Sequence, residues 1–182
     1  MTTGIIGTAG RDKSKPLTLD HWKWLIRDVR TRVPEGASVG SGGAAWMDHL
    51  AVSLMITGYA SELHLHLPAP FDRKLLRFKG PKGSAASAAN YYHEVFSRAI
   101  GRDTLKQLDE ALYHPNTTFT EEPERADYKG MFARNAKVAR FEEMLAYTFG
   151  LGDVPADGGT KNTWDQCQGK KTHITIPLQI YL

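Results

Sequence analysis

Three short turns of the chain combine glycine with small or hydroxyl-bearing residues: Gly7-Thr8-Ala9-Gly10, Ser41-Gly42-Gly43-Ala44 and Gly158-Gly159-Thr160. Because glycine has no Cβ, a ligand can approach its backbone closely. Where such a turn opens a helix, unpaired N–H groups and the positive end of the helix dipole suit an anion. A single turn of this kind is typical of an ordinary strand-to-helix connection, whereas three together favour a phosphate-bearing ligand.

Four charged side chains could act on such a ligand. The planar guanidinium of Arg134 can bind a phosphate at two points, which a lysine cannot do. Asp48 and Asp165 could accept hydrogen bonds from ribose hydroxyls or stabilise an oxocarbenium-like centre during C–N cleavage. Both positions also fit carboxylates that are simply favoured by a helix dipole. Glu94 is a spare candidate acid or base, and an amphipathic helix explains it equally well.

Metal chemistry has weaker support in the sequence. His64 and His66 would share one face of a strand and could be two metal ligands, but spacing identifies no third. Cys167 is the one cysteine of the chain, which excludes an intrachain disulfide and a cysteine-rich zinc site. We therefore expect no metal and no cofactor.

The elements that must position these residues alternate between strands and helices. Apolar runs predict strands near residues 3–7, 37–41, 62–67, 143–149 and 173–177. Helical spacing predicts helices near residues 18–33, 44–57, 85–100, 104–113, 131–140 and 163–168. Residues 62–67 alternate leucine with histidine and are expected at a sheet edge, while residues 71–83 and 114–130 are expected as loops. The alternation predicts an α/β fold with a mostly parallel central sheet, whose ligand lies at the carboxyl ends of the strands.

Composition limits the class of protein further. The chain has 182 residues, of which 41% are hydrophobic and 24% charged, with a formal net charge of +3. This length and composition suit one domain, residues 1–182, and exclude a wholly disordered chain. There is no apolar run of the roughly 20 residues that a membrane helix needs and no basic segment typical of a signal peptide. We expect a soluble, cytoplasmic protein without membrane contacts.

The order of the motifs resembles the SLOG superfamily of Rossmann-like proteins, which includes the SMF/DprA and LOG groups, and especially its YspA-like branch. The opening turn through Arg11 resembles the family's first glycine loop. The Ser41–Ala44 turn, followed by Asp48 and Ala51, is similar to its S-G-G-A-x-x-x-D-x-x-A signature. Arg134-Asn135 resembles the family's R-N pair, and Gly158-Gly159-Thr160 its G-G-T loop.

The resemblance covers roughly residues 4–58 and 131–177. It implies a Rossmann-like three-layer sandwich, within which residues 71–130 are a helical and loop insertion or a lid. The family also implies a nucleotide or nucleotide-derived ligand across the glycine turns. Trp46 stands where the signature often has glycine, so we expect its ring at the pocket mouth, stacked on a base. The resemblance further implies self-association into a homo-oligomer.

The candidate ligand-binding residues are Gly7, Thr8, Ala9, Gly10, Arg11, Ser41, Gly42, Gly43, Ala44, Trp46, Asp48, Arg134, Asn135, Gly158, Gly159, Thr160, Asn162 and Thr163. The leading hypothesis is binding, so that the chain senses or sequesters a signalling nucleotide as some family members do in bacterial and phage conflict. The alternative is a phosphoribohydrolase or related N-glycosidase, because LOG-type members cut the N-glycosidic bond with an arginine and a glutamate. Arg134 matches that arginine; the glutamate is missing, and Asp165 or Glu94 would have to replace it.

A third hypothesis is single-stranded DNA binding by analogy with the DprA branch. It would need a basic groove with exposed aromatic side chains. Five cations between residues 73 and 82, with Phe71 and Phe78, could supply part of one. Such a charged run is more often a solvated loop, and we do not expect nucleic acid as the partner.

Overall fold

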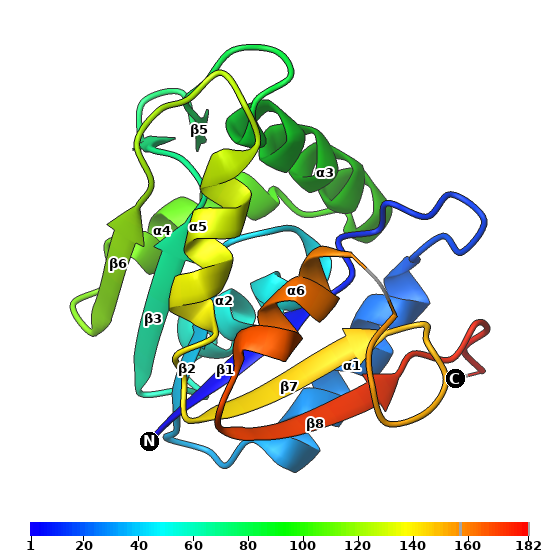
Figure 1. Ribbon diagram of the computed structural model, residues 1–182. Helices are drawn as coiled ribbons and strands as arrows, with labels where there is room; N and C mark the ends of the chain where they lie inside the picture. Colours follow the sequence, from blue (N-terminus) through cyan, green and yellow to red (C-terminus); the bar gives the residue numbers. More distant parts are fainter. Residues whose placement is uncertain (157, 182) are drawn as a thin grey trace.

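A computed structural model describes residues 1–156 and 158–181 of the chain (Figure 1). Its centre is a six-stranded sheet in the order β6-β3-β2-β1-β7-β8. Each neighbouring pair of strands in this sheet is parallel. The strands are β1 (Thr2–Gly7), β2 (Ser38–Ser41), β3 (Glu62–Leu67), β6 (Thr117–Glu121), β7 (Glu143–Thr148) and β8 (Lys170–Thr175).

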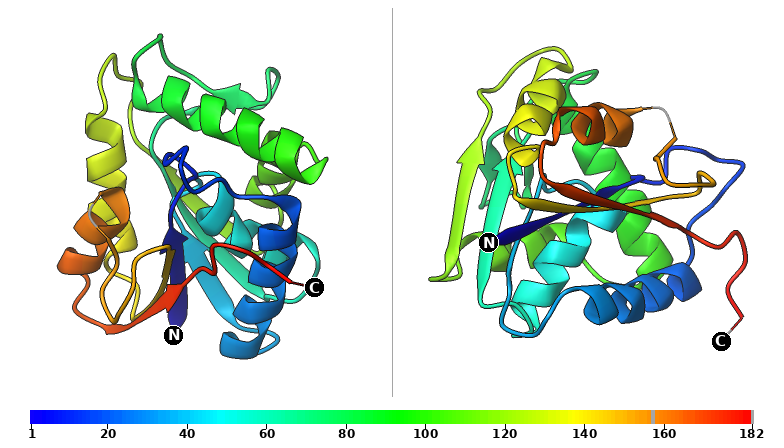
Figure 2. Two further views of the ribbon diagram at one scale, coloured as in Figure 1. Left: turned by 90° about the vertical axis from the view of Figure 1, so that its right-hand side faces the viewer. Right: turned by 60° about the horizontal axis from the view of Figure 1, so that its bottom comes forward.

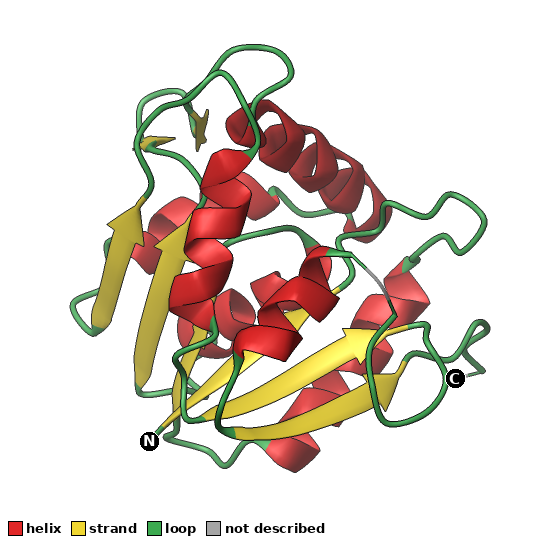
Figure 3. Ribbon diagram, in the orientation of Figure 1, coloured by secondary structure: helices red, strands yellow, loops and turns green. Residues whose placement is uncertain are grey.

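Helices cover both faces of the sheet (Figure 3). They are α1 (Leu19–Arg32), α2 (His49–Ile56), α3 (Ala85–Ile100), α4 (Thr104–Leu112), α5 (Lys129–Val138) and α6 (Gly159–Gln166), with a short 3-10 turn η1 (Trp46–Asp48) before α2. Helices α1, α2 and α4 pack on one face around the larger hydrophobic core, and α5 and α6 on the other around a smaller one. Helix α3 crosses above the carboxyl ends of the strands (Figure 2). The predicted α/β fold, a Rossmann-like three-layer sandwich, is confirmed.

The central strand β1 shows why this sequence forms a sheet buried on both faces. Ile5 and Ile6 are consecutive, so their side chains point to opposite faces. Ile5 packs into the larger core and Ile6 into the smaller. A strand covered on both sides reads as a continuous apolar run instead of an alternating one, which explains the short β-branched stretch at the start of the chain.

The expected edge position of residues 62–67 is wrong. This segment forms β3, which is paired with β2 on one side and with β6 on the other. Strand β6 lies within residues 114–130, which were expected as a loop. The side chains of His64 and His66, taken as signs of a polar edge, instead meet hydroxyls of β6: their Nδ1 atoms lie 2.6 Å from Thr118 Oγ1 and 2.7 Å from Thr120 Oγ1.

Two other predictions need smaller corrections. Residues 71–83, expected as a loop, include a two-stranded antiparallel hairpin of β4 (Phe71–Asp72) and β5 (Arg77–Phe78). The helix expected over residues 44–57 starts later, because η1 comes first and Trp46 has a φ of 63°. Within the described residues, no helix combines the length and apolar character needed to cross a membrane.

Candidate functional site

A cavity of about 630 Å³ opens at the carboxyl edge of the sheet. The structure brings residues of all three glycine turns to its wall. Twelve of the residues predicted from sequence line it: Gly7, Thr8, Ala9, Arg11, Ala44, Asp48, Arg134, Asn135, Gly158, Gly159, Thr160 and Thr163. Turns more than 100 residues apart in the chain meet there because β1, β2 and β7 are neighbouring parallel strands that end at one edge.

Contacts within the protein fix the conformation of the first turn. The Thr8 amide donates to the carbonyl of Tyr147 at 3.0 Å, so the chain leaves β1 alongside β7. A Cβ on Gly7 would lie 2.2 Å from that same carbonyl oxygen and would also collide with Met47. Glycine is therefore required at position 7 by the strand and helix packing. The Gly10 amide donates to Thr8 Oγ1 at 3.2 Å and closes the turn behind the cavity wall.

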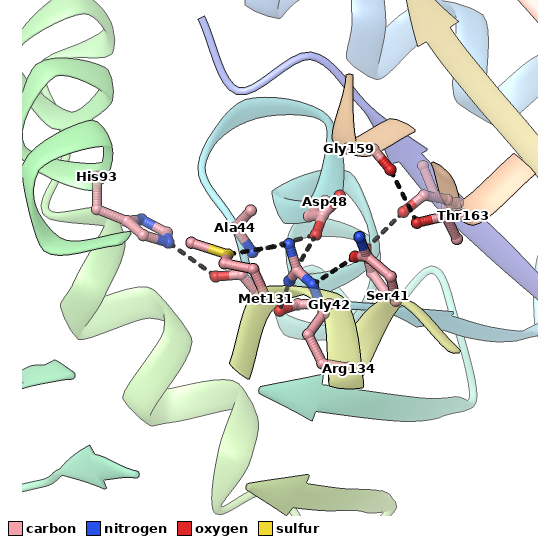
Figure 4. A network of polar contacts seen from close by, with 12 residues as sticks. Ser41, Gly42, Ala44, Asp48, His93, Met131, Arg134, Gly159 and Thr163 are labelled. Atoms are coloured by element: carbon pink, nitrogen blue, oxygen red, sulfur yellow. Dashed lines mark hydrogen bonds and ion pairs between the residues drawn. The ribbon is translucent and has the colours of Figure 1, made fainter. Parts of the chain in front are cut away.

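Arg134 braces the second turn (Figure 4). Its Nη1 donates to the carbonyl of Gly42 and lies 3.5 Å from Asp48 Oδ2. Its Nε donates to Asn135 Oδ1 at 2.9 Å. Asp48 Oδ2 in turn accepts the Ala44 amide at 3.2 Å. Most of the guanidinium's donors are thus used to hold the turn in shape, which leaves few for a phosphate.

Arg134 and Asp48 form a buried ion pair in the cavity wall. Their side chains are 11% and 7% exposed. Burial raises the pKa of Asp48, and the Arg134 guanidinium and the Ala44 amide oppose that shift. Burial likewise lowers the pKa of Arg134, opposed by the charge of Asp48. The two charges offset each other, so positive charge available to a ligand comes from Arg11 and Lys15 at the cavity rim, beside the carboxylate of Asp12.

Helix α3 also fixes the second glycine turn, through a hydrogen bond from His93. Gly43 has a φ of +75°, and a Cβ there would lie 2.4 Å from Leu67. The Nε2–H of His93 donates to the Gly43 carbonyl at 3.0 Å, and its Nδ1 lies 2.9 Å from Thr104 Oγ1. His93 packs edge-on against His49, with ring centroids 5.7 Å apart. Burial lowers the pKa of His93 to about 4 and that of His49 to about 3, so both rings are neutral near pH 7.

The third turn presents the N-terminus of α6 to the cavity. Gly158, with a φ of 120°, precedes the helix, and no side chain caps its first turn within the described residues. A Cβ on Gly159 would meet no atom within 4 Å, so this residue borders open space. Thr163 Oγ1 donates to the Gly159 carbonyl at 3.1 Å, which turns its hydroxyl inward along the helix. A helix N-terminus at a cavity wall is suited to an anion.

The structure does not bring Asp165 and Glu94 to the cavity. Asp165 is exposed and binds Lys161 Nζ at 2.6 and 2.7 Å, one helical turn earlier on α6. Glu94 is exposed on α3 and pairs with Arg98, again one turn away. Helical spacing explains the position of Asp165, because α6 turns Thr160 and Thr163 toward the cavity and so leaves Asp165 on the solvent side.

Trp46 is not at the pocket mouth. Its side chain is 2% exposed and packs in the hydrophobic core. Its ring centroid lies 4.4 Å from that of Phe96 and 6.4 Å from that of Trp22. The expected stacking of this ring on a base is therefore wrong, because aromatic side chains of α1 and α3 already enclose it.

Three other predicted residues, Ser41, Gly42 and Asn162, do not line the cavity. Ser41 is buried and its Oγ donates to the carbonyl of Ile5 at 2.5 Å. Asn162 Oδ1 accepts the Asn135 side chain at 3.3 Å and so ties α6 to α5. A Cβ on Gly42 would lie 2.2 Å from Arg134 Nη1, so glycine is needed there for the brace. These residues shape the turns without lining the cavity.

Sequence reasoning missed the aromatic part of the wall. Tyr92 on α3, and Tyr128 and Phe132 at the start of α5, line the cavity together with Met131. The spacing of Tyr128 and Phe132, four residues apart, would place them on one side of a helix. That signal is readable in the sequence, but nothing in the sequence tells which element the pair faces.

Three of the residues named in the hypothesis of single-stranded DNA binding are engaged within the protein. Phe71 and Phe78 are buried against each other, with ring centroids 5.3 Å apart, so neither is free to stack on a base. The Nε atom of Arg73 lies 3.3 Å from Asp109 Oδ1, and its guanidinium lies over the ring of Tyr113. Among the described residues, no three potential metal ligands come together.

Fold and site together define an α/β protein of Rossmann-like architecture with a cavity at the carboxyl edge of its sheet that is lined by both polar and apolar side chains. No protein-family profile matches the chain. No solved structure matches it. The chain is similar to the uncharacterized protein R261 of Acanthamoeba polyphaga mimivirus, with 29% identity over 188 residues. This similarity covers 98% of the chain and 96% of the viral protein, so it includes the segment between β3 and β7 as well as the glycine turns.

Proposed function

We propose that this chain binds a nucleotide or nucleotide-derived ligand at the carboxyl edge of its sheet, where it senses or sequesters that ligand. The observation that carries the proposal is the meeting of three glycine turns in one cavity beside the N-terminus of α6. The resemblance of the motif order to the SLOG superfamily supports the same ligand class.

The ligand's phosphate belongs at the first turn of α6 in this proposal. Gly159 and Thr160 line the cavity there, and the proposal assigns their amides and the Thr160 hydroxyl to the phosphate. Backbone N–H groups at a helix N-terminus bind phosphate without displacing another partner. Arg11 and Lys15 supply positive charge at the rim, and Arg134 keeps the Gly42–Gly43 turn open through its contacts with Gly42 and Asp48.

Hydrolysis of an N-glycosidic bond is the second candidate. The observation that favours it is the buried carboxyl of Asp48 in the cavity wall, the one carboxylate among the predicted catalytic or ribose-binding groups that lines the cavity. A carboxylate held there beside Arg134 could stabilise an oxocarbenium-like centre. Asp48 would then take the place of the glutamate that LOG-type enzymes carry.

Calorimetric titration with nucleoside mono-, di- and triphosphates and with dinucleotides tests both candidates, with chromatography of each mixture to detect free base. Saturable binding without product supports the binding function. Base release that disappears in Asp48→Asn supports hydrolysis. We expect Thr160→Val to weaken binding by about ten-fold, the value of one lost hydrogen bond to a charged group. Thr31→Val, on α1 and away from the cavity, is the matched control. Absence of binding to every compound contradicts the proposal.

A further inference from the structure

The cavity lining combines two kinds of groups. The glycine turns and the start of α6 contribute backbone and hydroxyl groups. The segment between β3 and β7 adds apolar and aromatic side chains to the lining, namely Ala89, Tyr92, Tyr128, Met131 and Phe132, beside the polar Arg134 and Asn135. A small-molecule site commonly joins an apolar surface to a few polar groups that fix the ligand's orientation.

Two of these aromatic side chains are unusually exposed for their size. The side chains of Tyr128 and Phe132 are 45% and 57% exposed, although both line the cavity. Tyr128 immediately precedes α5 and Phe132 lies one turn further, so both fall on the same side of the helix. No aromatic ring pairs with either of them among the described residues, whereas Trp46, Phe96 and Phe78 are all packed in the core. Exposed aromatic surface in a concave site marks a place for a ligand.

The third ring is already engaged by a cation. Tyr92 lies on α3, and the guanidinium carbon of Arg11 is 5.0 Å from its ring centroid. Arg11 comes from the loop that follows the first glycine turn, so this contact joins the aromatic side chains to the glycine turns of the cavity. Arginine planes and aromatic rings both stack on nucleobases.

We propose that Tyr92, Tyr128 and Phe132 form a nucleobase subsite, so that the ligand is a nucleoside phosphate and not a sugar phosphate or a free anion. This inference rests on the proposed function, because it assigns the aromatic part of the lining of the same cavity. It also gives residues 71–130 a role, since Tyr92 and Tyr128 come from that segment. The stacking surface expected of Trp46 is supplied by these rings instead.

The test compares probes with and without a base. AMP, GMP, CMP and UMP are titrated calorimetrically beside ribose 5-phosphate, against the wild-type chain and Phe132→Ala. We expect at least one nucleotide to bind about ten-fold or more tightly than ribose 5-phosphate. In Phe132→Ala that nucleotide should lose about ten-fold in affinity, as expected for a lost base–aromatic stack, while ribose 5-phosphate binds as before. Tyr181→Ala removes an aromatic ring that is 88% exposed near the C-terminus and is the matched control.

The outcomes test the base subsite separately from the proposed function. Equal affinity of all four nucleotides and ribose 5-phosphate in the wild-type chain overturns the base subsite and leaves the phosphate site standing. An equal loss for nucleotide and ribose 5-phosphate in Phe132→Ala also overturns the subsite. Tyr128→Ala gives a second, independent variant in case Phe132→Ala does not fold. Failure of these probes and of the nucleoside di- and triphosphates and dinucleotides to bind at millimolar concentration overturns the proposed function itself, and the base subsite with it.

Discussion

The contacts of Arg134 give this residue a structural part in the site that its sequence position alone does not reveal. A phosphate-binding arginine would keep its guanidinium free, whereas the Arg134 guanidinium contacts Gly42, Asn135 and Asp48. Its charge also keeps a buried carboxylate paired. Arg134, predicted as a ligand-binding and catalytic residue, lines the cavity, and its contacts indicate a brace for the second glycine turn.

Removing one member of this ion pair should cost more than removing both. We expect Arg134→Met to lower the free energy of unfolding by about 3–5 kcal/mol, because Asp48 is left buried and unpaired. Adding Asp48→Asn should recover part of that loss, because Asn keeps an acceptor for the Ala44 amide without a charge. Urea denaturation of the two single variants and the double variant measures the coupling. Strictly additive effects would show that the two side chains do not interact.

The buried pair His49 and His93 makes stability depend on pH. Both pKa values lie below the ordinary 6.5, at about 3 and about 4. Between pH 6.5 and 4 the unfolded chain therefore binds more protons than the folded one. We expect the free energy of unfolding to fall as the pH drops through this range, by about 1.4 kcal/mol per pH unit for each histidine.

Urea denaturation at a series of pH values measures this slope. His93→Gln removes one of the two titrating rings, so its slope between pH 6 and 4 should be clearly shallower than that of the wild-type chain. The comparison uses the slope, because the substitution also changes the hydrogen bond to Gly43. Identical slopes in the two proteins would rule out His93 as a source of the pH dependence.

A substitution at the start of α6 should affect ligand binding without lowering the stability of the fold. Gly159 borders open space and has no positive φ, so a methyl group fits there without strain. We expect Gly159→Ala to leave the free energy of unfolding unchanged or to raise it by up to about 1 kcal/mol, because alanine favours the helix. The same methyl group enters the cavity and should weaken nucleotide binding by about ten-fold. Gln168→Ala, at an exposed position just after α6, should change neither property. A loss of stability in Gly159→Ala that parallels the loss of binding would contradict the placement of Gly159 at the cavity.

The order of strands and helices could be predicted because strands with both faces covered are apolar throughout. Strand β6 could not, because its side chains are largely exposed and only the β-branched threonines indicate a strand. Its absence from the prediction also put β3 at the edge. The glycine turns could be located because glycine-rich stretches directly follow the apolar runs of the strands. The aromatic wall could not, because the direction of Tyr128 and Phe132 depends on where α5 packs.

The whole chain has one main core, which includes the segment of residues 71–130. Phe78, Phe96 and Leu108 from that segment pack in the same hydrophobic cluster as Ile5 and Val39 of the central strands. We expect one cooperative unfolding transition, with tryptophan fluorescence and far-ultraviolet circular dichroism changing at the same urea concentration. An earlier transition by one probe would instead show that the segment is a separable lid.

Self-association, expected from the family resemblance, stays a prediction that analytical ultracentrifugation can test.

Ligand binding should likewise stabilise the molecule as a unit. A ligand present at about 100 times its dissociation constant adds about 2.7 kcal/mol to the free energy of unfolding. For a chain of this size we expect the melting temperature to rise by about 5–10 °C. Differential scanning fluorimetry with the nucleotide panel measures the shift, and Thr160→Val should reduce it at equal ligand concentration.

A crystal structure of the chain with its tightest-binding nucleoside monophosphate tests the central claim most directly. The phosphate should lie against the backbone amides of Gly159 and Thr160, with the base on the aromatic wall beside Phe132. A nucleotide bound elsewhere, for example between α1 and the turn that joins α3 to α4, would contradict the claim that the three glycine turns form the binding site.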